Sequence, residues 1–141
     1  MAMKSEFIIS SLLPVQGHIS TVRGTKTELN EGSELSSHEI SNYFDEIVAK
    51  KNGKTFNFTW NPADKYKSTF TSIKANPKAK ESKKFKLAFS ARLVEDGKLV
   101  WSRQLDLKNA FVKDAGPDAR MGGQFVDLDY ESATPSKEVH H

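Results

Sequence analysis

The class of fold is decided by residues 85–107, which read FKLAFSARLVEDGKLVWSRQLDL. From Phe85 to Leu93, apolar side chains alternate with polar or small ones, which is the period of a strand with one buried face. The same period continues from Leu99 to Leu107. The pattern predicts a β-hairpin, and therefore an antiparallel sheet.

The length of the hairpin turn follows from the requirement that both apolar sets share one face of the sheet. A two-residue Asp96-Gly97 turn pairs Leu93 with Val100 and places the two sets on opposite faces. A three-residue turn over 95–97, with its glycine in the left-handed conformation, pairs Leu93 with Leu99 instead. The sequence therefore predicts the three-residue turn.

A helix is predicted over residues 37–52. Apolar side chains recur there at helical spacing, at Ile40, Tyr43, Phe44, Ile47 and Val48. Ser36 at the N-cap and Glu39 three residues later have the pattern of a capping box. Gly53 is expected to close the helix in the left-handed conformation.

The rest of the chain suggests more strands and three irregular segments. Strands are expected over residues 6–13, 18–23, 55–60, 68–74 and 125–130, and irregular chain over 25–36, 75–82 and 113–124. Because strands joined by short turns favour antiparallel pairing, the expected fold is α+β. It is an antiparallel sheet or β-sandwich of about six or seven strands, with one helix packed on it.

We expect a single globular domain over residues 4–131. Residues 132–141 read as a polar flexible tail, and their final His140-His141 resembles a cloning remnant.

Composition limits the possible chemistry. The 141 residues include no cysteine, so disulfides, thiolate metal ligands and a cysteine nucleophile are excluded. No apolar run reaches the length that spans a membrane, so a soluble protein without membrane insertion is expected. A cysteine-free chain favours the cytoplasm, although a processed secreted or periplasmic form stays open.

The most basic part of the chain is residues 50–86, where eleven lysines face two carboxylates, a net charge of +9. Six lysines gather in and beside a proline-containing loop: Lys74, Lys78, Lys80, Lys83, Lys84 and Lys86. They could meet the phosphates of a nucleic acid by charge alone, or simply keep a solvated loop soluble. Because lysines outnumber arginines seventeen to four, base-specific reading is the less favoured form of binding.

Two features of the predicted strands have both a structural and a functional interpretation. Phe56, Phe58 and Trp60 form an aromatic row on one face, which is more often core than a binding platform. Arg103 falls on the apolar face of the hairpin, opposite Phe89 in the predicted register. It is expected to extend to the sheet edge rather than to pair with a buried carboxylate.

Two further candidates lie towards the C-terminus. Asp127 and Asp129 are two apart on a predicted strand, so they share a face and are weak candidates for a metal site. The glycine-rich segment that follows Lys113 lacks the Lys and Ser/Thr of a phosphate-binding loop. It is interpreted as a partner-binding loop with three contact residues, Asp114, Asp118 and Arg120.

These patterns favour a non-enzymatic protein-binding module, such as an adaptor, an assembly component or an inhibitor, with no catalytic residue and no cofactor. Another protein is the expected partner, in an unspecified oligomeric state. The alternative is a nucleic-acid-binding module that uses residues 50–86. A metal-dependent enzyme built on Asp127 and Asp129 is the third hypothesis.

Overall fold

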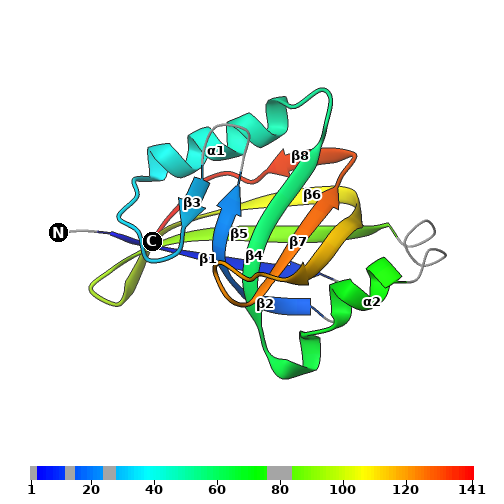
Figure 1. The fold of residues 1–141 in the computed structure, drawn as a ribbon. Coiled ribbons are helices and arrows are strands. Elements are labelled where there is room, and N and C mark those ends of the chain that lie inside the picture. The colour runs from blue at the N-terminus through cyan, green and yellow to red at the C-terminus, as the bar shows by residue number, and fades with distance from the viewer. Residues whose placement is uncertain (1–2, 12–14, 24–27, 76–83) are drawn as a thin grey trace.

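The computed structural model describes residues 3–11, 15–23, 28–75 and 84–141 (Figure 1). The strands in these residues are β1 (Lys4–Ser11), β2 (Val15–Arg23), β3 (Glu28–Asn30), β4 (Thr55–Pro62), β5 (Phe85–Glu95), β6 (Lys98–Pro117), β7 (Gln124–Asp129), β8 (Ser132–Pro135) and β9 (Val139–His140). The helices are α1 (Ser37–Ala49) and α2 (Thr69–Ala75), with a short 3₁₀ helix at Asp64–Tyr66.

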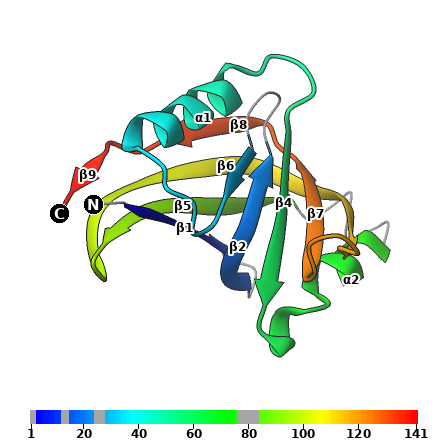
Figure 2. The same ribbon diagram turned by 60° about the vertical axis from the view of Figure 1, so that its left-hand side comes forward.

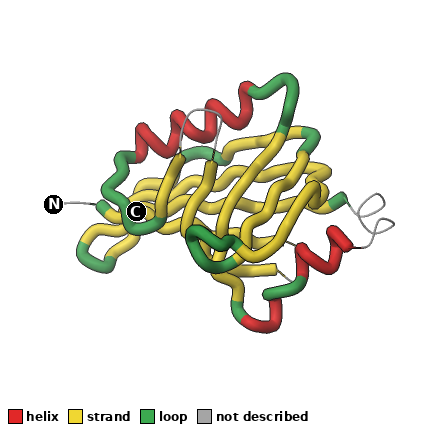
Figure 3. The backbone as a smooth tube through the Cα atoms, viewed as in Figure 1, coloured by secondary structure: helices red, strands yellow, loops and turns green. Residues whose placement is uncertain are grey.

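Six of these strands close into an antiparallel barrel, whose wall is visible as the yellow tube in Figure 3. Their order is β1-β5-β6-β7-β4-β2, and β2 pairs back onto β1. The antiparallel sheet is confirmed. The structure nevertheless has a barrel rather than an open sheet or a sandwich, because β1 uses both of its edges for pairing. The described residues also contain two α-helices where one was expected.

The long strand β6 pairs with different strands along its two halves. Its first half pairs with β8 and β9, whereas its residues from Phe111 onwards pair with β7. Between the two halves, Asn109 has a φ of 51° and the register with β5 shifts. A bulge of this kind bends a strand and increases its twist. The bend therefore allows β6 to pair with β8 and β9 along its first half and with β7 along its second half.

The β5–β6 hairpin turns in two residues, so the predicted three-residue turn is wrong. Asp96 and Gly97 both have a positive φ, of 51° and 76°, which is typical of a type I′ turn. One extra residue, Val100, then shifts the register, so that Leu93 pairs with Trp101. This bulge returns the apolar side chains of both strands to one face, an effect that the sequence led us to expect from a longer turn.

Aromatic side chains fill the interior of the barrel. Phe89 is 0% exposed, and its ring centroid lies 5.4 to 6.4 Å from those of four others: Phe7, Tyr43, Phe44 and Phe56. The predicted row of Phe56, Phe58 and Trp60 is part of the same core, with at most 1% exposure. The core interpretation of this row is confirmed, and the binding platform is wrong.

Helix α1 lies across one side of the barrel (Figure 2) and begins where the sequence predicts. The Ser36 hydroxyl accepts a hydrogen bond from the Glu39 N–H at 3.1 Å, which caps the first turn. The helix ends at Ala49, three residues before the predicted end. Gly53 is left-handed, with a φ of 61°, but it belongs to the turn into β4. Val48, predicted on the apolar face, is 43% exposed.

Residues 68–74, predicted as a strand, contain helix α2 instead. Phe70 and Ile73 are three residues apart, so a helix directs both towards the barrel. The buried Phe70 ring lies 5.4 Å from that of Trp60 and 6.3 Å from that of Phe85. Helix α2 therefore covers the end of the core where β4 finishes and β5 begins.

Residues 132–141 form β8 and β9 on the free edge of β6, whereas the sequence suggests a flexible tail. The Glu138 carboxylate accepts hydrogen bonds from the Trp101 Nε1–H at 3.2 Å and the Ser41 hydroxyl at 3.3 Å, which ties this segment to β6 and α1. Two segments predicted as irregular also contain strand, since β3 lies within 25–36 and residues 113–117 complete β6.

Arg103 lies on β6 opposite Ala91 rather than Phe89. Its guanidinium lies over the Phe44 ring, 5.6 Å from the centroid, and its Nε–H donates to the Ser136 carbonyl at 2.9 Å. The side chain reaches the edge of β6, as predicted.

Candidate functional site

A polar network covers the outer surface of β2 and β4. Arg23 lies opposite Asn57 on these two strands. Its Nη1 donates to the Asn57 side-chain oxygen at 2.8 Å and to the Thr59 hydroxyl at 3.3 Å. The Arg23 guanidinium therefore bonds to two residues of β4, and the Arg23 side chain remains 34% exposed.

Asp118 joins this network to the loop between β6 and β7. One carboxylate oxygen accepts the Arg120 and Met121 N–H groups at 3.0 and 2.9 Å, and the other accepts the Thr59 hydroxyl at 2.7 Å. The Met121 N–H, followed by the Thr59 hydroxyl, holds the pKa of Asp118 below its usual range. Asp118 therefore remains a carboxylate at neutral pH and fixes the start of the loop.

The loop, residues 118–123, is closed on itself by backbone hydrogen bonds. The Asp118 N–H donates to the Gly123 carbonyl, and the Gly122 N–H donates to the Asp118 carbonyl, each at 3.0 Å. Gly122 and Gly123 have φ values of 73° and 74°, which glycine adopts without a steric cost. The loop packs so closely over β4 that Thr59 on the outer surface is 0% exposed.

We call this surface the loop face; it consists of Arg23, Asn57, Thr59, Phe125 and residues 117–123. A hollow of about 380 Å³ lies in it, lined by residues that include Arg23, Asn57, Asp118, Arg120 and Phe125. Arg120 is exposed, and its guanidinium has no hydrogen bond or ion pair with the described residues. Met121 beside it is 47% exposed.

Two of the three predicted partner-loop residues meet in the loop face. Asp118 and Arg120 lie there, whereas Asp114 precedes them on β6 and forms an ion pair of 2.6 Å with Lys74 of α2. Arg23 and Asn57 were not predicted from the sequence, because they are 34 positions apart and only the pairing of β2 with β4 brings them together.

The two weak metal candidates are engaged with neighbouring strands. Asp127 accepts a hydrogen bond from the Asn57 amide, and Asp129 accepts one from the Thr55 hydroxyl at 3.2 Å. Burial, and after it the charge of Asp114, raises the pKa of Asp127. Among the described residues, no three His, Asp or Glu side chains come together in a group that could hold a metal ion.

The six predicted anion contacts do not form one described patch. Lys78, Lys80 and Lys83 lie outside the described residues. Lys74 is paired with Asp114, as above, and the Lys86 ammonium lies 3.8 Å from the Asp106 carboxylate. Lys84 is exposed, and its charge acts on Glu131 together with those of Lys54 and Lys108.

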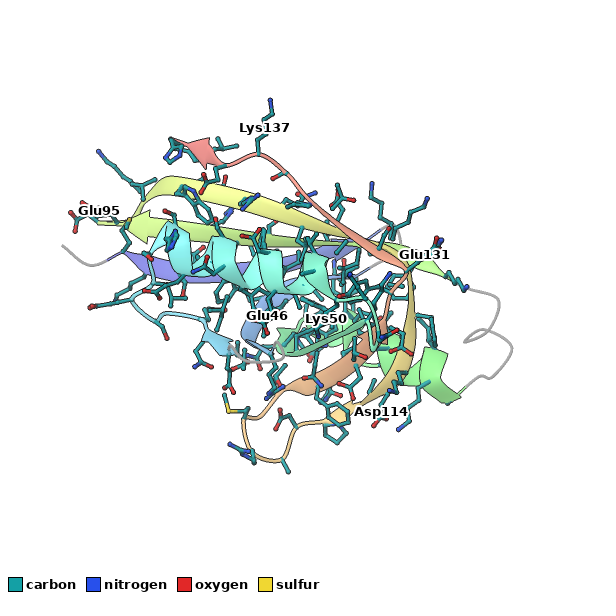
Figure 4. All side chains as sticks on the ribbon, turned by 90° about the horizontal axis from the view of Figure 1, so that it is seen from above. Glu46, Lys50, Glu95, Asp114, Glu131 and Lys137 are labelled. Carbon is teal, nitrogen blue, oxygen red and sulfur yellow. The ribbon has the colours of Figure 1, made fainter. Side chains whose placement is uncertain are left out.

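This second group, the lysine cluster, consists of Lys54, Lys84 and Lys108 around Glu131. The Lys54 ammonium donates to the Glu131 carbonyl at 2.8 Å, and the Glu131 N–H donates to the Lys108 carbonyl at 3.0 Å. A hydrogen bond from Asn109, and then the charges of the three lysines, lower the pKa of Glu131. Figure 4 shows Glu131 at the opposite end of the barrel from Glu95 and well apart from Asp114.

Comparison with known proteins adds no function to this geometry. No protein-family model, curated protein or solved structure matches the chain. None of the helices in the described ranges has the length and apolar character needed to cross a membrane.

Proposed function

We propose that this protein is a non-enzymatic protein-binding module and that the loop face is its docking surface. The observation that carries the proposal is the pair Arg120 and Met121, which are exposed on a loop whose own backbone is closed by hydrogen bonds. Arginine, methionine and aromatic side chains are enriched in protein interfaces. Phe125 adds a half-buried ring beside them.

The fixed loop also favours affinity. Ordering a flexible loop on binding costs free energy, and a loop that already holds its shape avoids that cost. The loop face has this preorganisation because Asp118 accepts three hydrogen bonds from Thr59, Arg120 and Met121. These hydrogen bonds hold the backbone of the loop, which suits a surface that keeps its form when a partner docks.

Photo-crosslinking at position 121 tests the docking surface. With the photoreactive residue p-benzoylphenylalanine in place of Met121, irradiation in the organism that encodes the protein should give a discrete adduct with another polypeptide. The matched control carries the same group in place of Lys98, an exposed residue at the opposite end of β6 from the loop. Adding Arg120→Glu should suppress the adduct at 121, since it reverses the charge that faces the partner.

The proposal is overturned if position 121 gives no adduct, or if positions 121 and 98 give the same set of adducts. Thermal unfolding of each variant identifies any that is misfolded, because Met121 and Arg120 are exposed and their replacement should leave the midpoint unchanged within the scatter of surface substitutions.

Nucleic-acid binding is the second candidate function, and the lysine cluster is the observation that favours it. The charges of three lysines act on one carboxylate there, so the local charge is positive. Lys84 and Lys108 are exposed and can reach phosphates without rearrangement of the barrel. Lysine contacts of this kind bind the backbone without reading the base sequence.

A gel-shift series with single-stranded DNA of mixed sequence tests this candidate. Binding should weaken steeply between low and moderate salt, because each neutralised phosphate releases counterions. The combined Lys84→Glu and Lys108→Glu variant should bind at least about tenfold more weakly, whereas Lys98→Glu should bind as the unaltered protein does. The absence of a shift at low salt, or an equal loss with Lys98→Glu, would remove the candidate.

A further inference from the structure

The hollow in the loop face brings two arginines from distant parts of the chain to one place. Arg23 comes from β2 and Arg120 from the β6–β7 loop, and both line the hollow. Arginine presents a rigid fork of N–H groups that matches the two oxygens of a carboxylate. The two arginines therefore share the lining of one hollow, an arrangement that suits an anion.

Arg23 keeps donor capacity after its contacts within the protein are satisfied. Its Nη1 donates to Asn57 and Thr59, while its Nη2 forms an ion pair with the Asp118 carboxylate at 3.9 Å, a distance too long for a hydrogen bond. The guanidinium is thus held in place by neutral oxygens at one end. Its other end remains available to a ligand, as does the whole guanidinium of Arg120.

Asp118 pairs with Arg23 by charge but makes no hydrogen bond to the guanidinium of either arginine. Both of its oxygens already accept short hydrogen bonds, from Thr59 on one side and from two loop N–H groups on the other. Both oxygens are therefore engaged in hydrogen bonds to other groups, which leaves the remaining N–H groups of the arginines to a ligand. The Asp127 carboxylate accepts a hydrogen bond from the Asn57 amide.

The charge balance favours a ligand with one negative charge. Asp118 lies beside the two arginines in the lining of the hollow, so a dianion would meet more repulsion than a single carboxylate. Pro117 and Phe125 add apolar wall to the hollow, which suits the aliphatic part of a glutamate or aspartate side chain. We infer that the loop face binds one carboxylate side chain of its protein partner between Arg23 and Arg120, an inference that rests on the proposed function.

An NMR titration of the full isotope-labelled chain tests the inference with acetyl-Leu-Glu-Ala-amide as the probe. Saturable shifts are expected at the backbone amides of Arg120, Met121 and Phe125. The neutral isostere acetyl-Leu-Gln-Ala-amide should bind at least about tenfold more weakly, because it cannot make charge-assisted bonds. Inorganic phosphate should also bind more weakly than the glutamate peptide.

Two variants sharpen the test. Arg120→Gln should weaken binding of the glutamate peptide at least about tenfold without affecting folding, because the Arg120 guanidinium has no hydrogen bond or ion pair with the described residues. Arg92→Gln, on the exposed surface of β5, is the matched control and should change nothing.

Equal affinity for the glutamate and glutamine peptides, tighter binding of phosphate, shifts confined to other surfaces, or equal loss in both variants would each overturn the inference. The outcome is separable from that of the proposed function. An adduct at position 121 without carboxylate preference leaves the docking surface standing and removes only the carboxylate, whereas loss of both removes the protein-binding function.

Discussion

Phe89→Ala is expected to lower the free energy of unfolding by about 3–5 kcal/mol, the range observed when a buried phenylalanine is truncated. Phe89 is fully buried, and its ring packs against rings from β1, α1 and β4. Removing it opens a cavity at the point where these three elements meet. Urea denaturation followed by circular dichroism measures the loss.

Phe111→Ala is the matched control. It removes the same ring from the outer surface of β6, where Phe111 is half-buried, and should cost about 1 kcal/mol or less. The difference between the two variants isolates the contribution of the barrel centre. If Phe89→Ala cost no more than Phe111→Ala, the ring would not be at the centre of the core.

Local patterns in the sequence were sufficient to predict those elements that are stabilised by contacts between residues close in sequence. The capped start of α1 follows from Ser36 and Glu39, and its buried face from the spacing of apolar residues. The β5–β6 hairpin was predicted correctly as a hairpin with a shared apolar face. The predicted length of its turn was wrong, because the sequence carries no separate signal for the bulge at Val100. This bulge places the apolar side chains of both strands on one face with a shorter turn.

Features that depend on distant parts of the chain were not predicted. Closure of the barrel requires β1 to pair with both β2 and β5, and nothing within β1 specifies its second partner. Helix α2 forms where a strand was expected, because Phe70 packs onto Trp60 and Phe85, and this tertiary contact outweighs a weak local preference.

The residues of the candidate site also fall into those that local sequence predicts and those that depend on distant strands. Asp118 and Arg120 were predicted because a glycine-rich loop between strands is recognisable in sequence. Arg23 was not, since its role depends on strand pairing that places it beside Asn57 and near Asp118. The polar network that fixes the loop is a product of the closed barrel.

Gly123→Ala is expected to cost about 2–5 kcal/mol of unfolding free energy, the sum of two effects. Gly123 has a φ of 74°, a conformation that costs alanine about 1–2 kcal/mol. In addition, a Cβ at this position would lie 2.5 Å from the Trp60 carbonyl oxygen, so the loop would have to move away from β4, at the cost of about 1–3 kcal/mol typical of overpacking. Thermal and urea unfolding measure the sum.

Gly122→Ala separates the two effects. Gly122 has nearly the same φ, 73°, but nothing lies within 4 Å of a Cβ added there. This variant should therefore lose only the conformational part, about 1–2 kcal/mol. Because Gly123→Ala displaces the loop from β4 and Gly122→Ala does not, only the former should also weaken the contact between Asp118 and Thr59, which amide chemical shifts of residues 118–123 would report. Equal losses in the two variants would mean that the loop does not approach Trp60 as closely as the structure places it, and that the loop face is less rigid than its proposed role requires.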